Sequence, residues 1–223
     1  MAVSSTELGS LDIKQLLIKQ SVPAAIGILF MSVNILIDTI FVGQWIGSLA
    51  IAAVSVVLPI TFLISSLGMA LGIGGSSIIS RALGANNRDK ALKTFGNQIM
   101  MTLNLAVVAV IIGSFYSEEV LLLFGANGEI MAPAKEFFMP VLYGVPFLAL
   151  CMMGNTVIRA EGKPKFAMIA MIIPAFSNII LDIIFIKFMN LGMFGAALAT
   201  SISMFLNFFG MRIWVFGVNE FSK

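Results

Sequence analysis

The 223-residue sequence contains no histidine and only one cysteine, Cys151. Without histidine, the chain lacks the commonest general base and the commonest protein ligand of transition metals. A single cysteine cannot form a disulfide within the chain. Charged residues make up 11% of the sequence, against about 25% in a typical soluble domain. The formal net charge of +2 gives no reason to expect a nucleic-acid partner. These absences exclude histidine-dependent catalysis, an internal disulfide framework and an ordinary soluble fold.

Hydrophobic residues are in excess: they make up 59% of the chain, and the mean hydropathy is +1.04. A helix that crosses the bilayer needs about 20 apolar residues, and six charge-poor segments are long enough. We therefore predict an all-α polytopic membrane protein with a six-transmembrane-helix bundle. The predicted spans are residues 20–42, 50–79, 94–116, 134–157, 166–186 and 194–217. Residues 1–20 are expected to form a cytoplasmic amphipathic segment, 21–217 the membrane lobe, and 218–223 a cytoplasmic tail or the start of a linker.

The lysines and arginines are distributed unequally between the two ends of the predicted spans. Eleven of the thirteen lie at the N-terminus, after the second span, after the fourth span, or at the C-terminus. Only Lys135 and Lys187 lie on the other side. Because cytoplasmic loops of membrane proteins are enriched in these residues, we expect a multi-pass protein of the cell membrane with both termini in the cytoplasm.

Two acids, Asp38 and Asp182, interrupt runs that otherwise read as membrane-spanning. A carboxylate at the centre of a bilayer costs about 2.5–3.5 kcal/mol on insertion scales, so such residues usually face a water-filled or ion-binding cavity. Each acid lies five residues before the outer end of its predicted helix, at a depth of roughly 8 Å. The two are therefore level, and they meet if the first and fifth spans pack side by side.

Other oxygen-bearing residues share helix faces with the acids. Asn34 precedes Asp38 by four residues, and Asn178 precedes Asp182 by four, so each pair lies on one face. In the sixth span Ala196 and Thr200 have the same spacing. Carboxylate, amide, hydroxyl and carbonyl oxygens suit a small hard cation or a proton. Two carboxylates in a low-dielectric site cannot easily both stay ionised, so the pair can load and release a proton.

Two other interpretations of these residues stay open from the sequence. Asn178, Thr200 and Asn155, taken singly, are ordinary polar contacts between membrane helices. Two close aspartates also permit an intramembrane aspartyl protease, because such a dyad can share a proton and activate water. Asp182, however, lacks the Gly-x-Gly-Asp setting of those enzymes, and we expect no enzymatic activity.

Several strings together resemble the N-terminal lobe of the multidrug and toxic compound extrusion (MATE) transporters, in particular the prokaryotic branch. They are Pro23 followed by Asp38-Thr39-Ile40-Phe41-Val42-Gly43, Leu83-Gly84-Ala85-Asn86-Asn87-Arg88, Asn155 to Pro164, Asn178 to Asp182, and Leu191 to Thr200. Their order and spacing extend over nearly the whole chain.

The resemblance implies secondary active efflux, in which Na⁺ or H⁺ entry drives export of an organic, often cationic, compound. Carried over residue by residue, the cation or proton site consists of Asp38, Asn178, Asp182, Thr200 and the carbonyl of Ala196, with Asn155 close by. Na⁺ would be held by Asp38, Asn178, Asp182 and Thr200. Pro23 would mark a bend in the first span that changes with loading. No cofactor is expected besides the coupling ion.

The resemblance also implies twelve spans in two lobes, with the substrate between them, whereas this sequence supplies one lobe. We expect a fragment of a longer protein or an engineered half, or else a half that pairs with a C-terminal lobe or a second copy of itself. A flippase for lipid-linked saccharides from the same superfamily is the alternative function. The basic residues lie in loops or at helix ends rather than in a central cavity, which argues against it.

Overall fold

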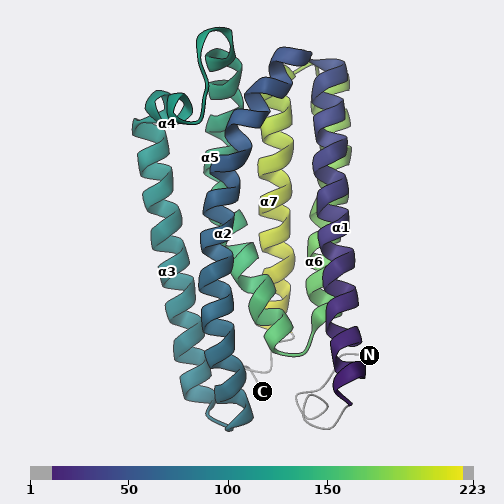
Figure 1. Ribbon diagram of the computed structural model, residues 1–223, viewed down its shortest axis with the longest axis vertical. Helices are drawn as coiled ribbons and strands as arrows, with labels where there is room; N and C mark the ends of the chain where they lie inside the picture. The colour runs from purple at the N-terminus through teal and green to yellow at the C-terminus, as the bar shows by residue number, and fades with distance from the viewer. Residues whose placement is uncertain (1–11, 218–223) are drawn as a thin grey trace.

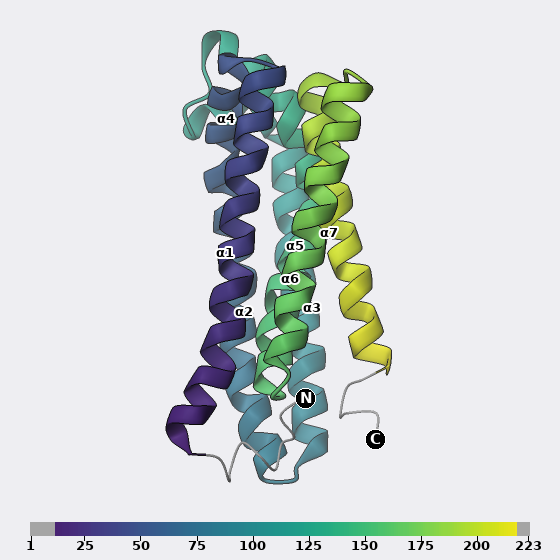
Figure 2. The same ribbon diagram turned by 90° about the vertical axis from the view of Figure 1, so that its right-hand side faces the viewer.

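The computed structural model describes residues 12–217, with side chains up to residue 210. Its elements are α1 (Ile13–Trp45), α2 (Ser48–Gly84), α3 (Arg88–Phe115), α4 (Ser117–Leu123), η2 (Gly128–Ile130), α5 (Met131–Ala160), α6 (Pro164–Asp182), η3 (Ile183–Phe188) and α7 (Gly192–Gly217). All of them are helical, and the long ones run nearly parallel to one axis (Figures 1 and 2). Six segments of the described chain are long and apolar enough to cross a membrane. The predicted all-α bundle is confirmed.

The long helices extend beyond the predicted spans at most ends. The first span was predicted from residue 20, but α1 begins at Ile13, so part of the predicted N-terminal segment belongs to the same helix. Residues 1–11 and 218–223 lie outside the described part. The breaks between helices are short: Gly47, with φ of 130°, separates α1 from α2, and Asn86, with φ of 54°, separates α2 from α3.

Five prolines lie inside long helices. They are Pro23 in α1, Pro59 in α2, Pro140 and Pro146 in α5, and Pro174 in α6. Proline removes one backbone donor from a helix and tends to kink it, but membrane helices tolerate it because neighbouring groups satisfy the freed carbonyl.

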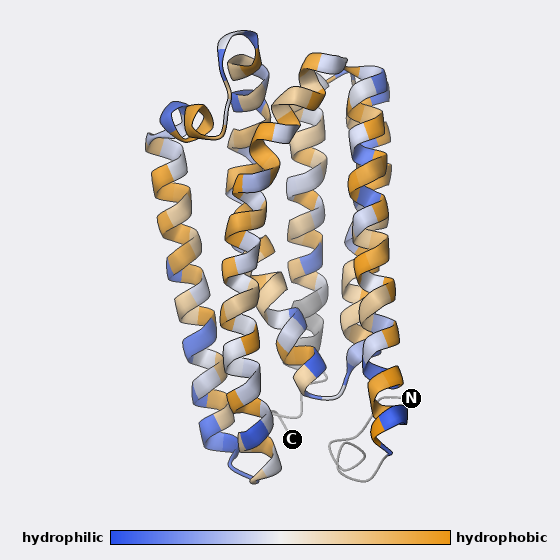
Figure 3. Ribbon diagram, in the orientation of Figure 1, coloured by the Kyte–Doolittle hydropathy of each residue, from blue (hydrophilic) through white to orange (hydrophobic). Residues whose placement is uncertain are grey.

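The hydropathy of the residues varies along the length of the helices. Figure 3 shows apolar residues over the middle of the bundle and hydrophilic residues around the turn between α2 and α3. Large apolar side chains such as Ile28, Leu29 and Leu36 of α1 are exposed. A protein surrounded by water would bury such a surface, whereas a bilayer solvates it.

α2 and α5 pack closely because glycines line their contact. A Cβ atom at Gly68 would meet the Ala149 carbonyl oxygen at 2.8 Å, and one at Gly72 would meet the Met153 Cα at 2.9 Å. α3 joins this pair through Gln98, a buried side chain whose Nε2 donates to the carbonyls of Leu71 (2.8 Å) and Gly72 (3.1 Å). Small residues at helix contacts and interhelical hydrogen bonds stabilise membrane bundles in place of the hydrophobic effect.

α4 packs beside the start of α5, at the end of the bundle opposite the α2–α3 turn (Figure 1). The Lys135 ammonium donates to the Glu118 carboxylate at 2.6 Å. This hydrogen bond and the charge of Lys135 lower the pKa of Glu118 below its usual range. Both side chains are exposed, so the pair adds little to stability.

Candidate cation site

Asp38 of α1 and Asp182, the last residue of α6, face each other. Their carboxyl groups lie close enough to share a hydrogen bond when one of them carries a proton. Asp182 is fully buried and Asp38 is half-buried. The two acids that the sequence singled out are therefore neighbours, as the prediction required.

The two helices meet in a constant register. α1 and α6 run in the same direction and lie side by side (Figure 1). Gly27 faces Met171, with 2.9 Å between its ideal Cβ position and the sulfur, and Asn34 Nδ2 donates to Asn178 Oδ1 at 2.8 Å. In both of these contacts, and again for the acids, the partners are 144 positions apart in the sequence. The i, i+4 spacing within each helix thus becomes a ladder of contacts that ends in the two carboxyls.

The acids are level with each other along the bundle. Asp38 lies seven residues before the end of α1, and Asp182 lies six residues before the end of η3. At 1.5 Å per residue, the two depths are about 9–11 Å, slightly more than the sequence predicted because both helical segments are longer.

α7 brings Thr200 and Ala196 to the same region. The Thr200 hydroxyl donates to the Ala196 carbonyl at 3.0 Å. Asp38, Asn178 and Thr200 all line one cavity of about 160 Å³ between α1, α2, α5, α6 and α7. Five of the six predicted site residues, all except Asn155, therefore lie in or beside one region of the bundle.

Several oxygens in this region have no protein donor among the described residues. They are Asp38 Oδ1 and both carboxylate oxygens of Asp182. Buried charge is tolerated when it is neutralised by a proton, a partner or a cation. One donor in the region, Asn178 Nδ2, is also buried without a partner among the described residues, but the acceptor oxygens outnumber it, and such a set fits H⁺ or a hard cation such as Na⁺.

The structure does not bring Asn155 to this site. Its Nδ2 donates to the Ala167 carbonyl at 2.9 Å, joining α5 to the start of α6. Ala167 precedes Asp182 by fifteen residues on the same helix, which corresponds to about 22 Å. In this conformation Asn155 is a buried interhelical contact, which is the ordinary role of a polar residue in a span.

Pro23 is buried in the N-terminal part of α1, far from the acids along the helix. Figure 2 shows this end of α1 bending away from the bundle. α1 is nevertheless one continuous helix through Pro23, and a response of this bend to cation or proton loading stays a prediction.

Sequence reasoning missed the wide helical turn that follows Asp182. The prediction continued an α-helix to residue 186, but Ile183–Phe188 form a π-helix, η3. Such segments are rare and often lie at functional sites. Lys187 of η3 lies over the Trp45 ring at 5.5 Å, so the ends of both acid-bearing segments are joined by a cation–π contact.

Asn207 also belongs to this region, although the sequence analysis did not select it. It lies on α7 and lines the same cavity, and its Oδ1 is buried without a donor among the described residues. Its spacing could have indicated this position, because Asn207 follows Thr200 by seven residues and so lies on the same helix face.

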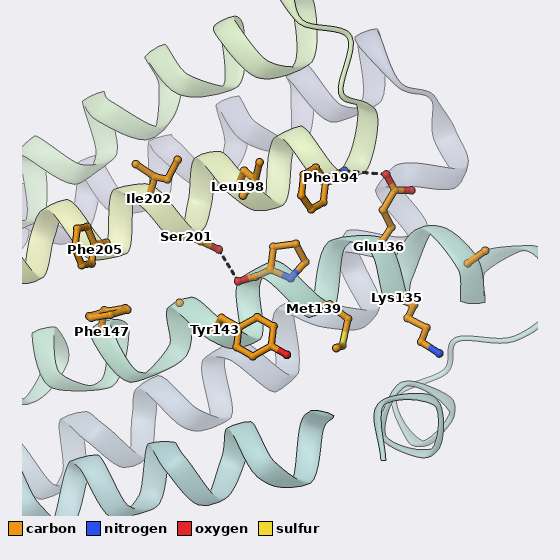
Figure 4. Close-up of a pocket in the computed structure, with 13 residues that line it drawn as sticks. Lys135, Glu136, Met139, Tyr143, Phe147, Phe194, Leu198, Ser201, Ile202 and Phe205 are labelled. Carbon is orange, nitrogen blue, oxygen red and sulfur yellow. Dashed lines mark hydrogen bonds between the residues drawn. The ribbon is translucent and has the colours of Figure 1, made fainter. Parts of the chain in front are cut away.

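A separate hollow lies between α5 and α7 and contains none of the predicted site residues (Figure 4). Its walls are mainly apolar and aromatic, with Tyr143, Phe147 and Phe205 along them. Its main polar contacts join the two helices: the Ser201 hydroxyl donates to the Pro140 carbonyl at 2.8 Å, and the Phe194 backbone N–H donates to Glu136 at 3.1 Å.

Six spans, an acid pair between the first and fifth, and an adjoining cavity define one lobe of a membrane transporter. The family model described as MatE matches residues 23–184. The chain belongs to the MATE family.

Among curated proteins, the chain is 30% identical to a probable multidrug resistance protein of Bacillus subtilis, over 87% of this chain and 43% of that protein. It is 32% identical to an FAD transporter of Shewanella oneidensis, over 87% of this chain and 44% of that protein. With a multidrug export protein of Staphylococcus saprophyticus it shares 34% identity over 82% of this chain and 41% of that protein. The chain thus spans less than half the length of these relatives.

Solved structures agree with this relationship. An outward-facing multidrug resistance MATE transporter of the MOP superfamily superimposes with a TM-score of 0.89 and 30% identity, over 97% of this chain and 48% of that one. A MATE described as being in the bent conformation gives a TM-score of 0.88 with the same coverage and identity. The single-lobe architecture is confirmed. The names of these relatives describe drug resistance, export or transport, and none of them describes a flippase or an enzyme.

Proposed function

We propose that this chain is one lobe of a cation-coupled efflux antiporter of the cell membrane. Entry of Na⁺ or H⁺ drives export of an organic, often cationic, compound. The other wall of the transport path is a C-terminal lobe or a second copy of this lobe, because a single lobe has no opposite wall for alternating access. Both termini face the cytoplasm, so Asp38 and Asp182 lie in the outer half of the membrane.

The proposal rests mainly on the surroundings of the Asp182 carboxyl group. It is fully buried against Asp38, and neither of its oxygens has a protein donor among the described residues. Asn178 Oδ1 already accepts from Asn34, and the Thr200 hydroxyl already donates to its own helix. Asn178 Nδ2 is buried without an acceptor among the described residues, but a neutral amide cannot neutralise two carboxylates, so a proton or cation is what the acids lack.

Loading and release at this pair provide a means of coupling. A ligand shifts a conformational equilibrium only by its difference in affinity between the two states. Asp38 and Asp182 lie on different helices, so any movement of α1 against α6 changes the number of oxygens around the cation. Loading therefore favours the state in which α1 and α6 are in register.

The cavity favours antiport of organic compounds over lipid-linked saccharide transport. Asp38 is the only charged residue among those that line it in the described structure, and the lining includes no lysine or arginine. A pyrophosphate would require basic partners, whereas a negatively charged, methionine-rich cavity suits organic cations of varied shape.

The direct test is ²²Na⁺ binding to the purified chain in detergent over a range of pH, with Asp38→Asn and Asp182→Asn. We expect saturable binding that decreases as the pH falls, because protons compete for the same carboxylates. Each substitution should abolish it. If the coupling ion is H⁺, the same variants should instead take up fewer protons in a potentiometric titration.

Asp89→Asn is the matched control, since Asp89 is an exposed aspartate in the first turn of α3. It should leave binding unchanged. The proposal is wrong if the chain binds no Na⁺ and its proton uptake is the same with and without Asp182→Asn.

A further inference from the structure

α3 carries two asparagines on the side that faces away from the bundle. Asn97 and Asn104 are exposed and lie seven residues apart, so they share one helix face. The buried residues of this helix, such as Phe95, Thr102 and Ala106, lie on the opposite face. α3 stands at the edge of the bundle and packs against α2 and α5 (Figure 1). The two carboxamides therefore face the surroundings of the protein rather than its interior.

Asn104 lies at the middle of the membrane-spanning part of α3. The charge-free run of this helix begins after Lys93 and ends at Phe115, and Asn104 is eleven residues from each of them. At 1.5 Å per residue it is about 16 Å from either end, which is close to half the hydrocarbon thickness of about 30 Å. Asn97 lies about 10 Å nearer the Lys93 end. Hydrocarbon offers no hydrogen-bond partner, and neither asparagine side chain has one among the described residues.

The residues around these asparagines follow the spacing of a two-stranded coiled coil. Asn97, Asn104 and Ile111 recur every seven residues. Met100 and Val107 follow the two asparagines by three residues, and all five side chains are exposed. An asparagine at such a seam fixes the register of two helices, and hydrogen bonds between polar side chains join membrane helices. These five residues are named the asparagine stripe.

A second copy of this chain supplies what the asparagine stripe lacks. Two copies of a membrane protein insert in the same orientation, because the same loops carry the lysines and arginines, so their α3 helices run parallel. A two-fold axis along the membrane normal then places each residue opposite its own counterpart at equal depth. Each Asn104 Nδ2 can donate to the Oδ1 of the other copy, so both carboxamides are satisfied reciprocally. A different protein would need a polar group of its own at the same depth.

We propose that the asparagine stripe of α3 is the contact surface of a homodimer in the membrane, with reciprocal hydrogen bonds between the two Asn104 side chains. None of the residues that line the cavity between α1, α2, α5, α6 and α7 belongs to α3 in the described structure. The paired surface is therefore separate from the transport path, and this second copy does not form the opposite wall of that path. The dimer is independent of cation binding.

Energy transfer between labelled chains in liposomes measures the dimer. Ala85→Cys in a Cys151→Ala background gives one exposed labelling site close to the start of α3. Transfer should rise with the protein-to-lipid ratio. Asn104→Leu should weaken the dimer by about 3- to 16-fold, the range for one polar contact between membrane helices. Asn104→Gln keeps the carboxamide and should retain the affinity within about twofold.

Asn127→Leu is the matched control, because Asn127 is exposed outside the spans and makes no capping hydrogen bond. It should leave the dimer unchanged. Asn104→Leu breaks no contact within one chain, so in excess detergent, where chains are single, its unfolding and ²²Na⁺ binding should match those of the unsubstituted chain. That comparison separates loss of the dimer from loss of the fold. A chain that stays monomeric at every ratio, or a dimer that Asn104→Leu leaves unchanged, overturns the inference and leaves the stripe to lipid or to another protein.

Two neighbouring isoleucines test the geometry of the contact. Ile111 and Ile112 are almost equally exposed, at 50% and 49%, but Ile112 is turned by about 100° from Ile111 and lies off the stripe. In the Cys151→Ala background, copper phenanthroline should link Ile111→Cys chains and leave Ile112→Cys chains single, because a disulfide needs Cα atoms about 4.4–6.8 Å apart. Both variants keep the two asparagines. Equal linking of the two variants, or none through Ile111→Cys, overturns the pairing of α3 with α3.

Discussion

At the scale of single residues, the acid pair depends on contacts made one turn away along both helices. Asn34 donates to Asn178 Oδ1 at 2.8 Å and lies within 3.4 Å of the Ala175 carbonyl oxygen. These contacts hold α1 and α6 in register one turn before the two carboxyls. A shift of one residue in this register would rotate Asp38 by about 100° around its helix and away from Asp182.

We therefore predict that Asn34→Leu lowers the free energy of unfolding by about 0.6–1.7 kcal/mol, the range for polar contacts between membrane helices. It should also weaken ²²Na⁺ binding severalfold, because the carboxyls lose their alignment. Unfolding of the purified chain in mixed micelles measures the first effect. Asn104→Leu, on the exposed face of α3, should change neither quantity, and equal results for the two variants would contradict the role of Asn34.

At the scale of helices, the bundle combines a tightly interlocked group with one helix, α1, that has few contacts outside α6. α2, α3 and α5 are locked by the glycine contacts and by Gln98, whereas α1 packs mainly against α6. Interfaces that already interlock resist sliding, so we expect movement between α1 and α6 rather than within the interlocked group.

Two neighbouring glycines of α2 test this division. A Cβ at Gly72 would collide with α5, while one at Gly74 would meet nothing within 4 Å. We predict that Gly72→Ala destabilises the chain by about 1–3 kcal/mol through overpacking. Gly74→Ala should be neutral or stabilising by about 0.5–1 kcal/mol, because alanine is the better helix former. Thermal unfolding in detergent distinguishes the two, and equal losses would show that the α2–α5 contact yields easily.

Much of this arrangement could be read from the sequence, and the exceptions have physical reasons. Hydropathy predicted the six spans, and i, i+4 spacing predicted that Asn34 and Asn178 would accompany the acids. The π-helix after Asp182 could not be predicted, since Ile183–Phe188 is an apolar run with no signal of irregular geometry. The position of Asn155 could have been anticipated: it lies five residues from the end of α5, at the opposite end of the bundle from the acids.

At the scale of the whole molecule, orientation in the membrane decides which side the acids open to, and the lone cysteine makes it measurable. Cys151 is buried, and Cys151→Ala provides a background without thiols. In that background we predict that Asn127→Cys, between α4 and α5, reacts with a membrane-impermeant maleimide in intact cells. Ala85→Cys, between α2 and α3, should react only after permeabilisation. Both positions are exposed, so the reverse pattern would overturn the cytoplasmic assignment of the termini.

The parallel course of α1 and α6 has an electrostatic consequence. Peptide dipoles align along a helix and leave a partial negative charge at its C-terminal end. Both acids lie about two turns before that end, beyond the last turn where the dipole acts strongly, so the main repulsion is between the two carboxylates themselves. Without a bound proton or cation, the two carboxylates repel each other and destabilise this end of the bundle. A single bound cation attracts both carboxylates and offsets their repulsion, so the feature that destabilises the empty site also makes the site sensitive to whether a cation is present.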